Sequence, residues 1–282
     1  MKQAKIIVLS GQSNAAGVGY VNCLPRSFSE QKIEEYRSGY SNIKLNYISY
    51  DCFSDGFVTT KIDKETIGPE LGIAEYLSEQ YPNEEFFIVK FAVGSASLRH
   101  DFLPPKRGAF SEIYKKEKLK ENHLQMYFPF RKGEPTKVGW CYRGLISLLH
   151  HSIEFLKEEG YTAEVIGFCW MHGESDACLI EHVENYQTDF DCFVHDFQNE
   201  FSEYLRDCIY VDAGISEIWP CYREMNTFKK EYADTHNHFR YIDTIENGLT
   251  THLEPVNDPD IYHYDSDSVI KLGRLFAQQI MG

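Results

Sequence analysis

The sequence predicts a three-layer α/β/α domain, with helices on both faces of a mostly parallel sheet of about five strands. Short apolar runs alternate with longer amphipathic stretches along the chain, which is the pattern of β-α-β units. The length of 282 residues suits one large domain, which buries roughly three quarters of the surface of its unfolded chain and needs no disulfide or metal to hold a core. We therefore expect residues 1–282 to form a single domain.

The individual elements follow from the spacing of apolar residues. Short apolar runs bounded by turn-forming residues predict strands, and apolar residues on one face of a 3.6-residue period predict helices. The last helix shows the signal well, because Asp267 can cap its first turn and Leu272 and Phe276 fall on one face. The expected strands are 5–9, 44–50, 86–93, 165–170, 208–212 and 239–243, and the expected helices are 69–80, 144–159, 181–204 and 267–281.

Residues 99–138 depart from this alternation. The stretch holds four prolines, many charges and little sustained periodicity. A connection of this length is either a disordered insertion or a functional element such as a lid. Because it begins at the end of a predicted strand, where open α/β sheets bind ligands, we favour a role facing the substrate.

Charge and composition exclude several classes of partner. The formal net charge is −15, and phosphate binding needs clustered Lys and Arg, so we expect no nucleic-acid partner. No apolar run approaches the ~20 residues of a membrane-spanning helix. The run at residues 6–9 is too short for a signal peptide. The eight cysteines include no Cys-x-x-Cys pair, which suggests reduced thiols, and we expect a cytoplasmic protein.

The first predicted strand leads directly into the segment SGQSNAAG at residues 10–17. A hydroxyl such as that of Ser13, at the end of a strand and flanked by small residues, can project into a cleft. Gly11 permits a tight turn there, and Gly17 permits close approach of other backbone. Taken alone, the segment is more typical of an ordinary strand-to-helix turn.

A second constellation, DPDIYH at residues 258–263, lies near the other end of the chain. A neutral histidine such as His263 can accept the proton of a serine hydroxyl, and a carboxylate on its other ring nitrogen fixes the tautomer. Asp260 stands three residues before His263, and Asp258 is a rival for the same role. Two further groups follow predicted strands, FAVGSA at residues 91–96 and WMHGESD at residues 170–176. All four groups fall at one edge of the predicted sheet, which favours an active site there.

Together these blocks resemble those of the SGNH-type hydrolases, in the same chain order. The chain is similar to the branch that contains sialate O-acetylesterases and the acetylxylan esterases of carbohydrate esterase family 6, over nearly its whole length. The resemblance implies a flavodoxin-like fold in which Ser13 is the nucleophile, His263 the general base and Asp260 its carboxylate partner. It also implies that the backbone N–H groups of Ser13 and Gly94 contribute to the oxyanion hole. Asn14, Ser95, His172 and Glu174 are expected on the oxyanion or substrate side of the site.

Two positions depart from the family pattern. His172 stands where the family usually has Gln, and Ser95 where it usually has a second Gly. If His172 faces the oxyanion, its ring donates an N–H. With a reference pKa of about 6.5, the ring would change charge in the working range. The alternative is that His172 is a supporting group hydrogen-bonded to Glu174 or to the backbone.

The sequence therefore predicts a serine esterase that works through an acyl-Ser13 intermediate, without a cofactor. The resemblance implies that it removes O-acetyl groups from a carbohydrate. Its partner would be a small-molecule or oligosaccharide ester. One alternative is an esterase or lipase acting on a non-carbohydrate ester, and another is an inactive relative that only binds carbohydrate. His150-His151 and His236-x-His238 lack companion metal ligands at convincing spacing, and no phosphate-binding glycine loop occurs, so we expect neither a metal nor a nucleotide.

Overall fold

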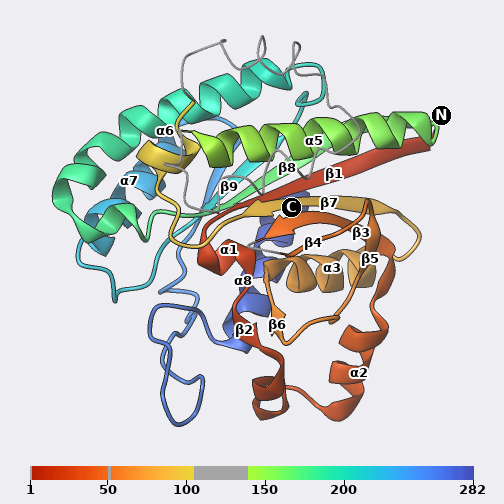
Figure 1. Ribbon diagram of the computed structural model, residues 1–282, viewed down its shortest axis with the longest axis horizontal. Coiled ribbons are helices and arrows are strands. Elements are labelled where there is room, and N and C mark those ends of the chain that lie inside the picture. The colour runs from red at the N-terminus through yellow and green to blue at the C-terminus, as the bar shows by residue number, and fades with distance from the viewer. Residues whose placement is uncertain (1, 50–51, 105–138) are drawn as a thin grey trace.

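The sheet dominates the architecture of the protein. The computed structural model describes residues 2–49, 52–104 and 139–282, so most of the 99–138 insertion lies outside the described residues. In these ranges the chain forms an eight-stranded sheet with helices on both faces (Figure 1). The expected three-layer α/β/α class is confirmed.

Six parallel strands make up the body of the sheet, and all six are the expected ones. The sheet order is β10-β9-β8-β1-β7-β3-β4, with β5 also paired to β3. The sheet exceeds the expected five strands, partly because the two antiparallel edge strands are too short to show any periodicity. The strands are β1 (Lys2–Gly11), β3 (Tyr40–Ser49), β4 (Cys52–Phe53), β5 (Val58–Thr60), β7 (Phe86–Ala92), β8 (Tyr161–Met171), β9 (Ile209–Ala213) and β10 (Phe239–Ile242). A separate small sheet pairs β2 (Gly19–Tyr20) with β6 (Thr66–Ile67).

The helices divide between the two faces of the sheet. Figure 1 shows α5 (Trp140–Glu158), α6 (Ile180–Glu200) and α7 (Tyr222–Thr235) on one face, and α3 (Pro69–Gln80) with α8 (Ser266–Met281) on the other. The four expected helices are confirmed. We did not expect the short α1 (Ser13–Ala16), α2 (Glu30–Ser38) or α7. No helix of the described chain is long and apolar enough to cross a membrane.

The polarity of α7 explains why its pattern escaped detection. Its buried residues are Met225, Lys229 and Tyr232, which follow helical spacing. A lysine in the middle of this narrow stripe interrupts the apolar period on which helix prediction depends.

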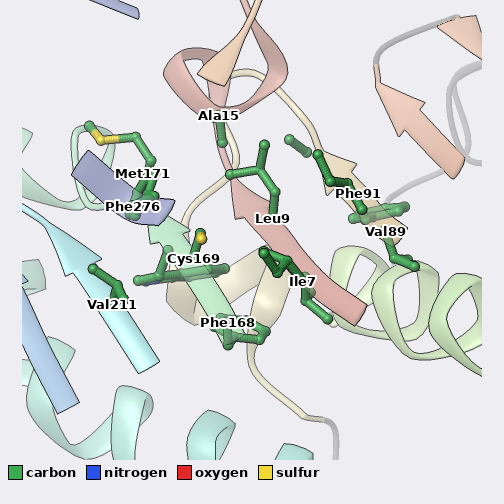
Figure 2. Close-up of a cluster of buried hydrophobic side chains, with 14 of the residues drawn as sticks. Ile7, Leu9, Ala15, Val89, Phe91, Phe168, Cys169, Met171, Val211 and Phe276 are labelled. Carbon is green, nitrogen blue, oxygen red and sulfur yellow. The ribbon is translucent and has the colours of Figure 1, made fainter. Parts of the chain in front are cut away.

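The core lies along the central parallel strands. Ile6 to Leu9 of β1 are fully buried, and so is nearly every residue of β7. Such continuous apolar runs are typical of parallel strands that are covered on both faces. Figure 2 shows apolar side chains of neighbouring strands packed together: Ile7 and Leu9 from β1, Val89 and Phe91 from β7, Phe168, Cys169 and Met171 from β8, and Val211 from β9, with Ala15 of α1 and Phe276 of α8.

The topology places the ends of three strands together. β7 lies on one side of β1, and the next parallel strand, β8, lies on the other side. Ligands of open α/β sheets bind at such a reversal of strand order, beyond the carboxyl ends of the strands. The segments after β1, β7 and β8 carry Ser13, Gly94 and Glu174, so these predicted residues share one edge.

Candidate active site

The turn after β1 presents Ser13 at this edge. The last residue of β1, Gly11, has a φ of +143°, and a Cβ there would lie 1.9 Å from the carbonyl oxygen of Met171. Only glycine fits both conditions. Gln12 then donates its backbone N–H to the same carbonyl at 3.0 Å. Ser13 begins α1, where the first backbone N–H groups of a helix have no partner within the helix.

Asn14 connects this turn to both other parts of the site. Its Nδ2 donates to Oε1 of Glu174 at 3.0 Å, and its Oδ1 accepts the backbone N–H of Tyr264 at 2.9 Å. Tyr264 directly follows His263. Asn14, the residue after the candidate nucleophile, is thus bonded to the residue after the candidate base and to the loop after β8.

His263 and Asp260 form a close pair. His263 Nδ1 lies 2.6 Å from Asp260 Oδ2, and Oδ1 of the same carboxylate accepts the backbone N–H of Tyr262 at 3.2 Å. The rival carboxylate, Asp258, is exposed, and the structure gives its side chain no hydrogen bond to His263. Of the two carboxylates, that of Asp260 is the one in contact with His263. No hydrogen bond joins Ser13 Oγ to His263 Nε2, a contact that tightens in many enzymes only when substrate binds.

The turn after β7 lies beside the Ser13 turn. Val93 donates its backbone N–H to the Gly11 carbonyl at 3.2 Å, and Ala96 donates back to Val93 at 3.4 Å. Within this turn the Gly94 N–H has no hydrogen-bond partner among the described residues, as an oxyanion donor requires. Ser95 has a φ of +59°, a left-handed conformation that favours glycine. This conformation explains why glycine suits the position that Ser95 occupies in this chain.

Glu174 is fully buried beside the site. Burial raises the pKa of its carboxyl group, while the Asn14 amide and the positive charges of Lys229 and His263 oppose the rise. Its Oε2 atom has no hydrogen-bond partner among the described residues. The carboxyl group therefore positions Asn14.

His172 lies beneath the site, inside the protein. It is fully buried, stacks on Trp170 at a centroid distance of 4.6 Å, and its Nδ1 lies 3.1 Å from the Tyr186 hydroxyl. Burial, followed by the charge of Lys229, lowers the pKa of His172 well below its ordinary value, although the Ala96 backbone opposes this. The ring is therefore neutral near pH 7. We therefore do not expect His172 to change charge in the working pH range, although its reference pKa suggested this.

Replacing His172 with Gln should leave the shape of the pH–rate profile unchanged. Because the pKa of His172 is lowered, its imidazole is already neutral throughout the usual titration range of histidine. Its replacement therefore takes away no group that changes charge in that range. The measurement is kcat/KM against pH for the wild type and His172→Gln, with thermal unfolding to verify that both fold. Loss of one inflection in the variant would show that His172 titrates while the enzyme works.

Sequence patterns did not reveal the role of Lys229. This buried lysine of α7 donates from Nζ to the His172 carbonyl at 2.6 Å, to Asp212 at 2.6 Å and to the Ala213 carbonyl at 2.8 Å. It thereby binds the carboxyl ends of β8 and β9 together and supports the loop that carries Glu174. Burial raises the pKa of Asp212 to about 6, and the adjacent ammonium opposes this shift. The one sequence feature that could have indicated this role is the position of Lys229 at helical spacing between the apolar residues Met225 and Tyr232.

The start of the 99–138 insertion also belongs to this edge. The short π-helical turn Leu98–Phe102 begins with the Leu98 N–H donating to the Asp176 carboxylate at 3.1 Å. Phe102 packs edge-on against Trp170 at 5.0 Å. Residues 105–138, and with them the expected substrate-facing role of most of the insertion, lie outside the described residues.

One histidine of each pair named as a metal candidate has another partner. His150 Nε2 lies 2.7 Å from Glu200, and His236 Nδ1 lies 2.9 Å from the Tyr232 carbonyl. In the part of the chain that the structure describes, no three His, Cys, Asp or Glu side chains gather as metal ligands.

Fold and site together suit a hydrolase, and comparison with known proteins identifies the family. A sequence profile described as "Carbohydrate esterase, sialic acid-specific acetylesterase" matches residues 131–282. The chain belongs to this family, and its reaction is the removal of acetyl groups from a carbohydrate. The matched region contains Glu174, Asp260 and His263, whereas Ser13 lies outside it. Comparison with curated proteins gives no match.

Solved structures share the fold at low sequence identity. A protein from Arabidopsis thaliana has a TM-score of 0.63 at 14% identity, covering 100% of this chain and 98% of its own. NanS has a TM-score of 0.63 at 15% identity, covering 99% and 97%. A carbohydrate acetylesterase from Xanthomonas citri has a TM-score of 0.56 at 11% identity, covering 98% of this chain and 55% of its own. At these identities the comparison concerns the fold alone.

Proposed function

We propose that the protein hydrolyses O-acetyl esters of a carbohydrate with Ser13 as its nucleophile, His263 as its general base and Asp260 as the carboxylate that orients the imidazole. The observation that carries this proposal is the bridge made by Asn14 between the Ser13 turn and the segment of His263. The short His263–Asp260 contact supports it, because a carboxylate on Nδ1 leaves Nε2 as the proton acceptor.

The reaction has two steps. Ser13 Oγ attacks the acetyl carbonyl and loses its proton to His263 Nε2, and the negative charge that develops on the carbonyl oxygen is met by the N–H groups of Ser13 and Gly94. Each such donor contributes roughly 3 kcal/mol in the transition state. His263 then gives its proton to the departing sugar oxygen. A water molecule, deprotonated by the same histidine, cleaves the acetyl-serine, so that acetate leaves and Ser13 regains its proton.

The acyl side of the site is built from small residues. The three alanines of the two turns, Ala15, Ala16 and Ala96, are buried. They pack inward and do not line the cleft edge. Gly94 and Ser95 are the small residues that remain accessible. Their small size leaves room for an acetyl group.

We therefore expect acetyl esters to be better substrates than butyryl esters, and much better than octanoyl esters. The test is kcat/KM for the p-nitrophenyl esters of the three acids, together with acetate release from a panel of acetylated glycans. A value that rises with chain length would instead support a lipase-like enzyme. Binding of acetylated glycans without acetate release would support an inactive carbohydrate-binding relative.

A further inference from the structure

We propose that Trp219 and Tyr262 form an aromatic subsite that stacks against the sugar ring whose acetyl ester is being cleaved. The inference rests on the proposed function, because it takes His263 as the group that protonates the departing sugar. The two rings lie with their centroids 5.4 Å apart at an angle of 47°. Tyr262 is the residue directly before His263 in the chain.

The chemistry of the reaction determines the side on which the sugar must lie. In ester cleavage the general acid gives its proton to the departing alcohol oxygen, so the alcohol part lies against the histidine. The acetyl part lies toward the Gly94 and Ser13 N–H groups. Because Tyr262 directly precedes His263 in the chain, we place the ring pair on the sugar side of the scissile bond.

Both aromatic residues stand on anchored segments. Ile215, at the start of the loop that carries Trp219, exchanges two hydrogen bonds with the Asn226 side chain of α7, at 2.8 and 2.9 Å. Cys221, at the end of this loop, donates its backbone N–H to the Ala177 carbonyl at 2.9 Å. Ala177 lies three residues after Glu174. The loop is thus tied to α7 on one side and to the Glu174 segment on the other.

The catalytic segment holds Tyr262 equally firmly. Its backbone N–H donates to Asp260, and the Tyr264 hydroxyl donates to the Gly214 carbonyl at 3.3 Å, at the base of the Trp219 loop. The two segments therefore contact each other through the aromatic pair and through Tyr264. A preformed platform of this kind binds a ring without paying to order its own loops.

The surface around the pair is apolar and open. Tyr262 is 51% exposed, and the residues that precede Tyr262 and Trp219 in the chain, Ile261 and Ile218, are 37% and 39% exposed. Trp219 is partly buried against the core, and its indole N–H has no acceptor among the described residues. Exposed apolar patches, and buried donors without an acceptor, are both unusual in a surface whose only role is to stabilise the fold. An aromatic face next to a carbohydrate-cleaving histidine suits the apolar C–H face of a sugar ring.

The test compares two acetyl esters that differ in their alcohol. The probes are methyl β-xylopyranoside triacetate, which has a sugar ring, and ethyl acetate, which has none, with released acetate measured for both. Trp219→Ala should lower kcat/KM for the xyloside by roughly 10-fold, mainly through KM, as loss of one stacked ring would. The same variant should hydrolyse ethyl acetate within about twofold of wild type, and Trp219→Phe should recover most of the loss.

Two further variants complete the experiment. Tyr262→Ala, which removes a half-exposed ring, should show the same selective loss and covers the case in which Trp219→Ala fails to fold. Phe155→Ala removes a ring that is 38% exposed near the carboxyl end of α5, and it should leave both substrates unchanged. Equal losses on the two esters, or no loss on the xyloside, would overturn the subsite. A wild-type enzyme that releases no acetate from either ester would instead refute the proposed function itself.

Discussion

Ser13→Ala should lower kcat by on the order of 10⁶-fold while leaving the fold intact, because a covalent nucleophile has no substitute in the site. Ser13 Oγ forms no hydrogen bond to the described residues, so its removal leaves no buried group unpaired. A fluorophosphonate probe should label Ser13 in the wild type and no serine in the variant. The measurements are acetate release, mass spectrometry of the labelled peptide, and thermal unfolding.

Ser10→Ala is a matched control for this experiment. Ser10 lies three residues earlier on β1 and is also buried, but its hydroxyl donates to the Phe91 carbonyl within the sheet at 2.7 Å. We expect this variant to lose some stability, about 1 kcal/mol for one hydrogen bond, and to retain labelling at Ser13. Near-normal activity of Ser13→Ala, or labelling of another serine, would contradict the assigned nucleophile.

Asp260→Asn should lower kcat by about 10⁴-fold. An asparagine amide facing Nδ1 would favour the wrong tautomer of His263 and would not stabilise the imidazolium that forms when Ser13 gives up its proton. The turn itself should persist, because an amide oxygen can still accept the backbone N–H of Tyr262. The measurement is the kcat of the purified variant against wild type, on the same acetyl ester.

Asp258→Asn provides the matched comparison, since it makes the same chemical change two residues away. Asp258 is exposed, and the described hydrogen bond of this residue is made by its backbone, to the Pro255 carbonyl. We expect activity close to that of the wild type. If Asp258→Asn lost the greater part of the activity and Asp260→Asn did not, the two carboxylates would have to exchange roles.

Much of the fold could be predicted because its signals are local. The buried parallel strands are near-continuous apolar runs, and helices such as α3 and α8 bury one regular face, so neighbouring residues define them. The elements that we missed carry little local signal. β4 and β5 are two and three residues long, and α7 places a lysine within its buried stripe.

The candidate site could be predicted in part for a related reason. In a parallel sheet the carboxyl ends of the strands share one edge, so polar groups after β1, β7 and β8 were expected to meet there. The resemblance implies Asp260 as the partner of His263, but the spacing of residues alone leaves Asp258 as a rival. The structure adds that the Asp260 carboxylate is the one that contacts His263.

By itself, the sequence determined the fold class, the residues that follow each strand, and the family resemblance. The tertiary structure decided what those residues touch. Asn14 meets Glu174 across 160 residues of chain and Tyr264 across 250, and His172 became a neutral core residue once Trp170 and Tyr186 enclosed it. The physical reason is range: propensity and periodicity act between near neighbours, whereas contacts and pKa shifts arise when packing brings distant segments together and removes them from water.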